Sequence, residues 1–192
     1  MAHELKDKKI AILATDGVEE VELTRPRDAV TGEGARVDVV SLSDGELQAM
    51  NHDIEPASKI AVDTTAAEAS PSDYDALIMP GGTVNADRLR MDPDVRSFVQ
   101  EIFRAGKPVG VICHGPWTLI DAGVVEGRTL TSYPSLRTDL RNAGAKVVDE
   151  EVVTDEGLVS SRNPGDLDAF CAKIVEEFAE GALPVHDRGA TA

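Results

Sequence analysis

The 192-residue sequence is poor in cysteine and in aromatic residues. Its two cysteines, Cys113 and Cys171, lie far apart, and neither belongs to a CxxC pair or to a spacing typical of zinc ligands. We therefore expect two free thiols in a reducing compartment. Aromatic residues make up only 4% of the chain, so the core has to be built from Val, Ile, Leu and Ala side chains.

The sequence also lacks a long apolar segment. No run approaches the ~20 apolar residues that a membrane-spanning helix needs. The first residues, 1–9, are charged and contain no apolar stretch of the secretory type. These absences predict a cytoplasmic protein with no membrane partner.

Positive charge is scarce as well. The formal net charge is −16 and the sequence pI is near 4.5, so phosphate groups would be repelled and nucleic acid is not an expected partner. The sequence contains no Walker loop, no GxGxxG after a strand and no zinc spacing. We therefore expect neither a metal nor another cofactor.

Short buried strands alternate with helical segments along the chain, which predicts an α/β fold with an open, mainly parallel sheet. We interpret residues 9–180 as one domain, residues 1–8 as an N-terminal extension and residues 181–192 as a tail. The segment 83–86 is expected to be a loop, and Pro26 to bend or divide the first helix. The expected strands are 9–14, 36–41, 75–80, 108–112, 129–132 and 146–148, with hairpins within 44–70 and 152–161; the expected helices are 18–31, 93–105, 117–122, 134–142 and 167–180.

The strongest local signal is Cys113, which follows the apolar run 108–112 and precedes His114 and Gly115. A nucleophile at a strand-to-helix turn is exposed above the sheet, and the helix N-terminus would lower the thiol pKa. Gly115 gives the turn steric room, although Val111 stands where the usual elbow has a glycine. The alternative interpretation is a buried structural cysteine. His114 is either a base for Cys113 or an exposed loop histidine.

Two further segments are expected at the same edge of the sheet. Glu19 and Glu22 are three residues apart, which would place them on one helix face, where a carboxyl group could share the thiol proton. They could equally be surface charges that complement the helix dipole. Gly81 and Gly82 follow a strand and could present N–H groups as an oxyanion hole. Cys171 lies in the apolar face of the last helix and is interpreted as core.

Taken together, these segments resemble the ThiJ/PfpI superfamily, and in particular the PfpI-type intracellular protease branch with its bacterial stress proteins. The resemblance extends from about residue 9 to residue 180. The matching segments are Glu19 to Leu23, Pro80 to Gly82, Ile112 to Pro116, Thr131 to Pro134 and Val159 to Arg162.

The resemblance implies a three-layer, flavodoxin-like sandwich related to class I glutamine amidotransferases, and a homodimer or larger assembly. It implies Cys113 as the nucleophile, Glu22 as the carboxyl group that hydrogen-bonds it and His114 as the catalytic histidine. In PfpI-like proteins an acidic residue from an adjacent subunit completes a triad with this histidine. Asp87 is the matching position here, with an Asp in place of the longer Glu.

Three functions fit these residues. The first is a stress-associated cysteine hydrolase of peptidase or amidase type, with Cys113 attacking a carbonyl group. The second is cofactor-free glyoxalase or deglycase chemistry on methylglyoxal or glycated groups. The third is a non-enzymatic sensor or chaperone, with Cys113 oxidised to a sulfinic acid. The sequence favours the hydrolase. The expected substrate is a peptide or an amide for the hydrolase and a small aldehyde for the glyoxalase or deglycase.

Overall fold

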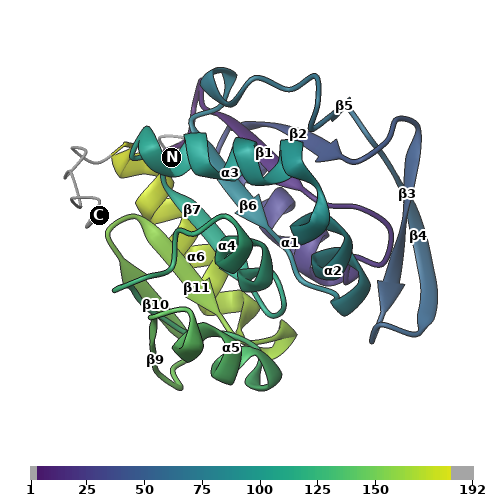
Figure 1. Cartoon of the computed structure of the whole chain (residues 1–192). Helices are drawn as coiled ribbons and strands as arrows, with labels where there is room; N and C mark the ends of the chain where they lie inside the picture. Colours follow the sequence, from purple (N-terminus) through teal and green to yellow (C-terminus); the bar gives the residue numbers. More distant parts are fainter. Residues whose placement is uncertain (1–3, 183–192) are drawn as a thin grey trace.

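The computed structural model describes residues 4–182, and within them the central sheet has seven strands (Figure 1). The strand order is β10-β11-β7-β6-β1-β2-β5, and all neighbours are parallel except β10 and β11. This confirms the predicted α/β sandwich with a mainly parallel sheet. The strands are β1 Lys9–Leu13, β2 Arg36–Ser41, β5 Thr64–Thr65, β6 Ala76–Met79, β7 Val109–Ile112, β10 Val152–Asp155 and β11 Leu158–Ser161.

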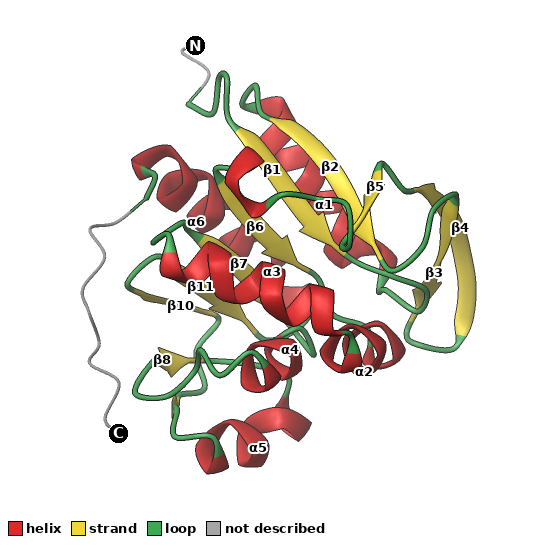
Figure 2. Cartoon of the chain, turned by 45° about the horizontal axis from the view of Figure 1, so that its top comes forward, coloured by secondary structure: helices red, strands yellow, loops and turns green. Residues whose placement is uncertain are grey.

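Helices cover both faces of the sheet and form the outer layers (Figure 2). Helices α1 (Glu20–Gly32) and α6 (Leu167–Glu180) contact each other on one face. The other face carries α2 (Thr83–Met91), α3 (Pro93–Arg104) and α4 (Pro116–Asp121). The remaining helix, α5, spans Arg137–Asn142, and short 3-10 turns occur at Pro71–Asp73, Pro134–Leu136 and Pro164–Asp166.

Two small sheets lie outside the central one. Strands β3 (Glu46–Asn51) and β4 (Glu55–Ala61) form an antiparallel hairpin beyond the β5 edge (Figure 1). Strands β8 (Thr129–Leu130) and β9 (Lys146–Val147) pair in parallel with each other. The first hairpin matters for the site because its turn packs against the carboxyl ends of the central strands.

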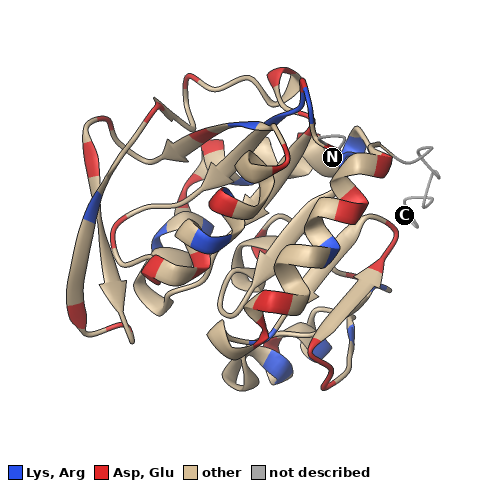
Figure 3. Ribbon diagram, turned by 180° about the vertical axis from the view of Figure 1, so that it is seen from behind, with Lys and Arg blue, Asp and Glu red and all other residues tan. Residues whose placement is uncertain are grey.

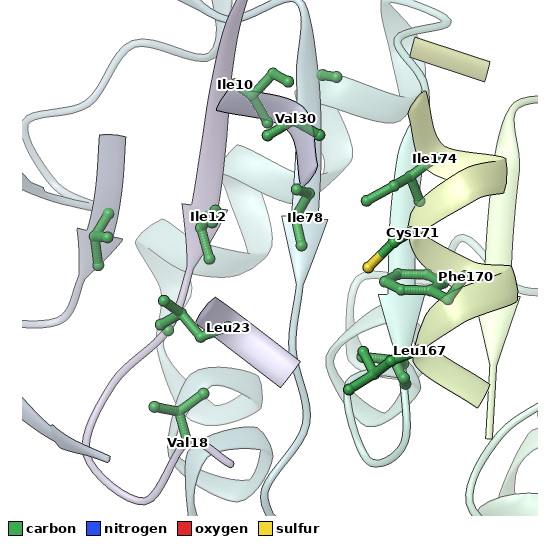
Figure 4. Close-up of a cluster of buried hydrophobic side chains, with 14 of the residues drawn as sticks. Ile10, Ile12, Val18, Leu23, Val30, Ile78, Leu167, Phe170, Cys171 and Ile174 are labelled. Atoms are coloured by element: carbon green, nitrogen blue, oxygen red, sulfur yellow. The ribbon is translucent and has the colours of Figure 1, made fainter. Parts of the chain in front are cut away.

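The cores on the two faces are mainly aliphatic, as the composition predicts. In α6, apolar residues at helical spacing face the sheet beside Ile78 and Ile10, and Cys171 lies among them (Figure 4). The interpretation of Cys171 as core is therefore confirmed. The buried residues of α6 are Leu167, Phe170, Cys171, Ile174 and Phe178.

Two sequence-based expectations about helices have to be corrected. Helix α1 is not divided at Pro26, although Pro26 has no N–H to donate to the Glu22 carbonyl; a bend at this residue stays a prediction. Pro26 is buried within this continuous helix. The segment 83–86 is not a loop, because it forms the first turn of α2.

The chain ends fall partly outside the described residues. Within the predicted extension 1–8, Leu5 is fully buried and belongs to the core. Its N–H donates to the Glu33 carbonyl, and the Lys8 carbonyl accepts the Arg36 N–H. Of the predicted tail, residues 183–192 lie outside the described part. Between residues 4 and 182, the helices are all too short or too polar to cross a membrane.

Candidate active site

Cys113 lies in the turn between β7 and α4, with a positive φ of 61°. Such a conformation costs a non-glycine residue energy and is held here by the packing around it. The Cys113 N–H donates to the Ser161 carbonyl, which extends the pairing of β7 with β11 by one residue. Gly115 is required close by, because a Cβ there would meet Val111 and the Met79 carbonyl oxygen. The turn therefore fixes the thiol above the sheet.

His114 contacts the thiol directly. Its Nδ1 lies 3.2 Å from the Cys113 sulfur, and its Nε2 lies 3.4 Å from the Thr83 hydroxyl and 3.3 Å from the Ser135 hydroxyl. The ring stacks on Tyr133, with the centroids 4.7 Å apart. Burial lowers the His114 pKa, so the imidazole is neutral near pH 7 and one of its nitrogens can accept a proton. His114 is not an exposed loop residue.

Glu22 lies close to Cys113, because a Cβ at Gly81 would meet both residues, and it is fully buried. Its Oε2 accepts a hydrogen bond of 2.8 Å from the Gly81 N–H, while Oε1 is buried without a hydrogen-bond partner. Burial raises the Glu22 pKa to about 8, and the charges of Glu19 and Asp53 contribute in the same direction. Glu22 is therefore protonated near pH 7 and can donate a hydrogen bond from Oε1.

The sulfur itself is less acidic than the sequence predicted. Burial raises the Cys113 pKa, and a charged Glu22 would raise it further, while the N–H groups of Gly82 and His114 lower it. Only 6% of Cys113 is exposed, so loss of solvent outweighs the N–H groups at the helix start. The expectation of a lowered thiol pKa was wrong, and thiolate formation has to rely on His114 as the base.

Gly81 and Gly82 allow the backbone to approach the thiol closely. A Cβ at Gly81 would lie 2.5 Å from Glu22 Oε2 and 2.6 Å from Cys113 Cβ. Gly82 has a φ of +88°, and a Cβ there would lie 2.2 Å from the Gly17 carbonyl oxygen. Side chains are thus excluded at both positions, which leaves the Gly82 and His114 N–H groups directed at the sulfur.

Glu19 and Glu22 do not share a helix face. Glu19 is the residue before α1, and its extended backbone turns the side chain toward the β3–β4 turn. There its carboxylate accepts hydrogen bonds from the N–H groups of His52 and Asp53 at 3.2 and 3.4 Å. Glu19 supports the hairpin, whereas Glu22 lies close to the thiol.

Asp87 lies on α2, one turn beyond Thr83, and its side chain is exposed. Its role toward the histidine of an adjacent subunit stays a prediction.

Sequence reasoning missed two residues near the site, Asp53 and Asn85, and gave Thr83 no role. Asp53 accepts hydrogen bonds from Thr83, and Asn85 is buried and joins α2 to Thr15 and to the Pro80 and Gly81 carbonyls. No local sequence pattern connects Asp53 with Thr83.

A shallow pocket adjoins the site on the far side of Asp53. It lies between the hairpin, the turn after β1 and α2, and Cys113 and His114 do not line it. Its lining residues are Asp16, Gly17, Gln48, Met50, Asp53, Val84 and Arg88. Within residues 4–182, no group of His, Cys, Asp and Glu side chains is arranged to hold a metal ion.

A protein-family model matches the sequence over nearly the whole chain. Residues 8–177 match the DJ-1/PfpI family. The chain belongs to the DJ-1/PfpI family. An uncharacterized protein of Staphylococcus epidermidis is 40% identical over 175 residues, covering 89% of this chain and 98% of that protein. An uncharacterized protein of Staphylococcus aureus is 41% identical over 173 residues, with the same coverage.

Solved structures of DJ-1/PfpI proteins share the fold. DJ-1beta of Drosophila melanogaster has a TM-score of 0.80 at 31% identity, with 90% of each chain covered. A two-domain protein of Anabaena variabilis, with DJ-1/ThiJ/PfpI-like and ferritin-like domains, has a TM-score of 0.85 at 35% identity. The match covers 96% of this chain but only 52% of that one. The resemblance to the ThiJ/PfpI superfamily is thus confirmed.

Proposed function

We propose that this protein converts small 2-oxoaldehydes, such as methylglyoxal, to 2-hydroxy acids without a cofactor. The observation that carries the proposal is the placement of Cys113 beside two groups in opposite roles. His114 is neutral and faces the sulfur with Nδ1, while the protonated Glu22 lies close to Cys113, beside Gly81. A base and an acid beside one thiol suit the addition of sulfur to an aldehyde.

The first half of the reaction makes a hemithioacetal and then an enediol. His114 takes the thiol proton, the sulfur adds to the aldehyde carbon, and the carbonyl oxygen takes the proton of Glu22. The Glu22 carboxylate then removes the hydrogen from that carbon, and the neighbouring ketone oxygen takes the proton held by His114. At this point one carbon–sulfur bond has formed, Glu22 is protonated again and His114 is neutral again.

The second half makes and hydrolyses a thioester. Glu22 delivers its proton to the second carbon while His114 removes the proton from the hydroxyl group on the first, which gives a 2-hydroxyacyl thioester on Cys113. Water then adds to the thioester and gives a proton to the Glu22 carboxylate, the carbon–sulfur bond breaks as the sulfur takes the proton held by His114, and the hydroxy acid leaves with the thiol restored. The first carbon is oxidised and the second is reduced, so no external oxidant or reductant is needed.

The enclosure of the site supports a small substrate. Cys113 and His114 are each only 6% exposed, and a peptide bond in an extended chain needs more room than an aldehyde. This geometry favours the aldehyde reaction over the hydrolase that the sequence favours. Removal of reactive aldehydes would also fit a role in stress.

The hydrolase is the second candidate. The Cys113–His114 contact and the N–H groups of Gly82 and His114 at the sulfur support it. In that reaction Glu22 has no necessary step as a proton donor. A sensor role is supported only by the protonated Glu22, which could hydrogen-bond an oxygen of an oxidised Cys113.

The test is turnover of methylglyoxal to lactate, measured beside a fluorogenic peptide panel, for the wild type, Cys113→Ala and Cys171→Ala. We expect lactate from the wild type and from Cys171→Ala, and none above background from Cys113→Ala. Cleavage of peptides alone would overturn the proposal in favour of the hydrolase. If reduced wild type acts on neither, and Cys113 oxidises stoichiometrically at low peroxide, the sensor replaces both.

A further inference from the structure

We propose that Asp53, acting through the Thr83 hydroxyl, is a positioning residue that sets the tautomer of His114 and so keeps its Nδ1 free to accept the Cys113 proton. The inference rests on the proposed function only in that His114 acts as a base. Asp53 comes from the β3–β4 turn, outside the central sheet and thirty residues before Thr83 in the chain.

The Asp53 carboxylate binds Thr83 twice. One oxygen accepts the Thr83 main-chain N–H at 2.7 Å, and the other accepts the Thr83 hydroxyl at 2.8 Å. The carboxylate therefore fills the place of a cap at the start of α2, where Gly82 has no side chain to offer. The single hydroxyl proton of Thr83 is thereby donated to Asp53.

The hydrogen bond from the Thr83 hydroxyl to Asp53 determines whether Thr83 can donate to His114 or only accept from it. A hydroxyl group has one proton, and with that proton on Asp53 its oxygen can only accept from the imidazole. The Thr83 oxygen lies 3.4 Å from His114 Nε2, so the pair favours a hydrogen on Nε2. In the neutral ring the other nitrogen, Nδ1, then lacks a hydrogen and faces the sulfur at 3.2 Å as an acceptor.

Ser135 offers the opposite arrangement. Its hydroxyl lies 3.3 Å from the same Nε2, and its side chain is exposed. If Ser135 donated to Nε2, the ring hydrogen would move to Nδ1, and His114 could not take the thiol proton. The two hydroxyl groups compete at one nitrogen, and only Thr83 is oriented by a carboxylate.

The hairpin turn is built to hold Asp53 in place. His52 and Asp53 both have positive φ angles, 54° and 64°, and the Glu19 carboxylate accepts the N–H groups of both. Main-chain hydrogen bonds also tie Met50 to Val18 and Gly17 to the hairpin. The supporting role assigned to Glu19 thus extends, through Asp53 and Thr83, to the imidazole. This connection lies within one chain and does not require Asp87 from a partner.

The deciding variant is Asp53→Asn. The amide has nearly the same shape, and its oxygen still accepts the Thr83 N–H, so the start of α2 keeps its cap. Its NH₂ group, however, donates to the Thr83 oxygen and releases the hydroxyl proton toward His114 Nε2. Thr83→Val removes the hydroxyl, Thr83→Ser restores it, and Ser135→Ala removes the competitor.

The first readout is the nitrogen NMR spectrum of histidine-labelled protein near neutral pH, with the His114 signals assigned from a His114→Gln sample. We expect the wild type to carry its hydrogen on Nε2, and Asp53→Asn and Thr83→Val to shift the population toward Nδ1–H. Thr83→Ser and Ser135→Ala should match the wild type. A wild type with its hydrogen on Nδ1, or spectra unchanged in Asp53→Asn and Thr83→Val, would overturn the proposal.

The second readout is the alkylation rate of Cys113 by iodoacetamide, followed by mass spectrometry of its peptide. Asp53→Asn and Thr83→Val should slow it ~10-fold or more, equivalent to about one unit of thiol pKa. With methylglyoxal, kcat should fall on the order of 100-fold with little change in KM. Because neither NMR nor alkylation needs a substrate, both still decide the inference if the wild type proves inactive on aldehydes. An unchanged alkylation rate in both variants would overturn it.

Discussion

At the scale of single residues, the site is governed by burial rather than by the helix start. The sequence locates the nucleophile, its neighbouring histidine and a nearby carboxyl group, because Cys113, His114 and Glu22 lie in short local patterns. It does not reveal how little solvent reaches them. Burial raises the pKa of Glu22 to about 8 and also raises that of Cys113, so both groups are neutral near pH 7.

The buried carboxyl group of Glu22 should make stability depend on pH. Its pKa is near 4.5 when unfolded and about 8 when folded, so between these values the unfolded chain loses a proton that the folded protein keeps. Glu22 therefore favours unfolding increasingly from pH 4.5 to pH 8, by roughly 1.4 kcal/mol per pH unit at most, and levels off above that. This stability is regained as the pH falls from 8 to 4.5 and is fully present below pH 4.5.

Glu22→Gln removes this titration while keeping the shape and the acceptor for the Gly81 N–H. The free energy of unfolding of the variant, minus that of the wild type, should therefore grow from pH 5 to pH 8 to a few kcal/mol. Urea unfolding of both proteins at several pH values measures it. A difference that stays constant with pH would mean that Glu22 titrates alike in both states. The same variant should lose lactate formation.

At the scale of elements, local patterns predict the helices that carry their own signals. Pro93 and the Asp92 cap, whose side chain accepts the Asp94 and Val95 N–H groups, mark the start of α3. Helix α2 has no such signal, because its first N–H is bound by Asp53 from a distant hairpin. A cap supplied from elsewhere in the fold leaves no trace in the sequence around the helix, and the Asp53–Thr83 pair escaped prediction for the same reason.

The turn before α2 should tolerate no side chain. Gly82→Ala would place a Cβ against the Gly17 carbonyl oxygen and the Glu19 N–H as well as in a left-handed backbone. We expect a loss of more than ~3 kcal/mol of stability, the scale of severe overpacking added to backbone strain. The matched control is Gly45→Ala, which has a φ of +93° but open space around it, and should lose only ~1–2 kcal/mol. Equal losses in thermal or urea unfolding would contradict this account.

At the scale of the whole molecule, acidic residues are spread over the helices, the hairpin and the loops (Figure 3). The architecture follows from the order of buried strands and helices, which the sequence shows clearly. The placement of the β3–β4 hairpin does not follow, since its pairing is internal and its attachment depends on single side chains such as Glu19. The edges of the fold were therefore less predictable than its centre.

The net charge of −16 should make the folded protein sensitive to ionic strength. Folding brings like charges together, and salt screens them over a Debye length of ~10 Å at 0.1 M. We expect the melting temperature to rise between 20 and 300 mM NaCl, and equally with KCl. A lower melting temperature in salt would mean that ion pairs such as Arg162 with Asp166 outweigh the general repulsion.

The pairing of β7 with β11 has a consequence for the newly made chain. The N–H of Cys113 is bound by Ser161, a residue that leaves the ribosome long after the thiol does. At a synthesis rate of ~5–20 residues per second, the nucleophile waits several seconds before the strand that encloses it exists. During that interval the cysteine is an ordinary exposed thiol, open to electrophiles and oxidants, and its protection begins only after β11 has been synthesised.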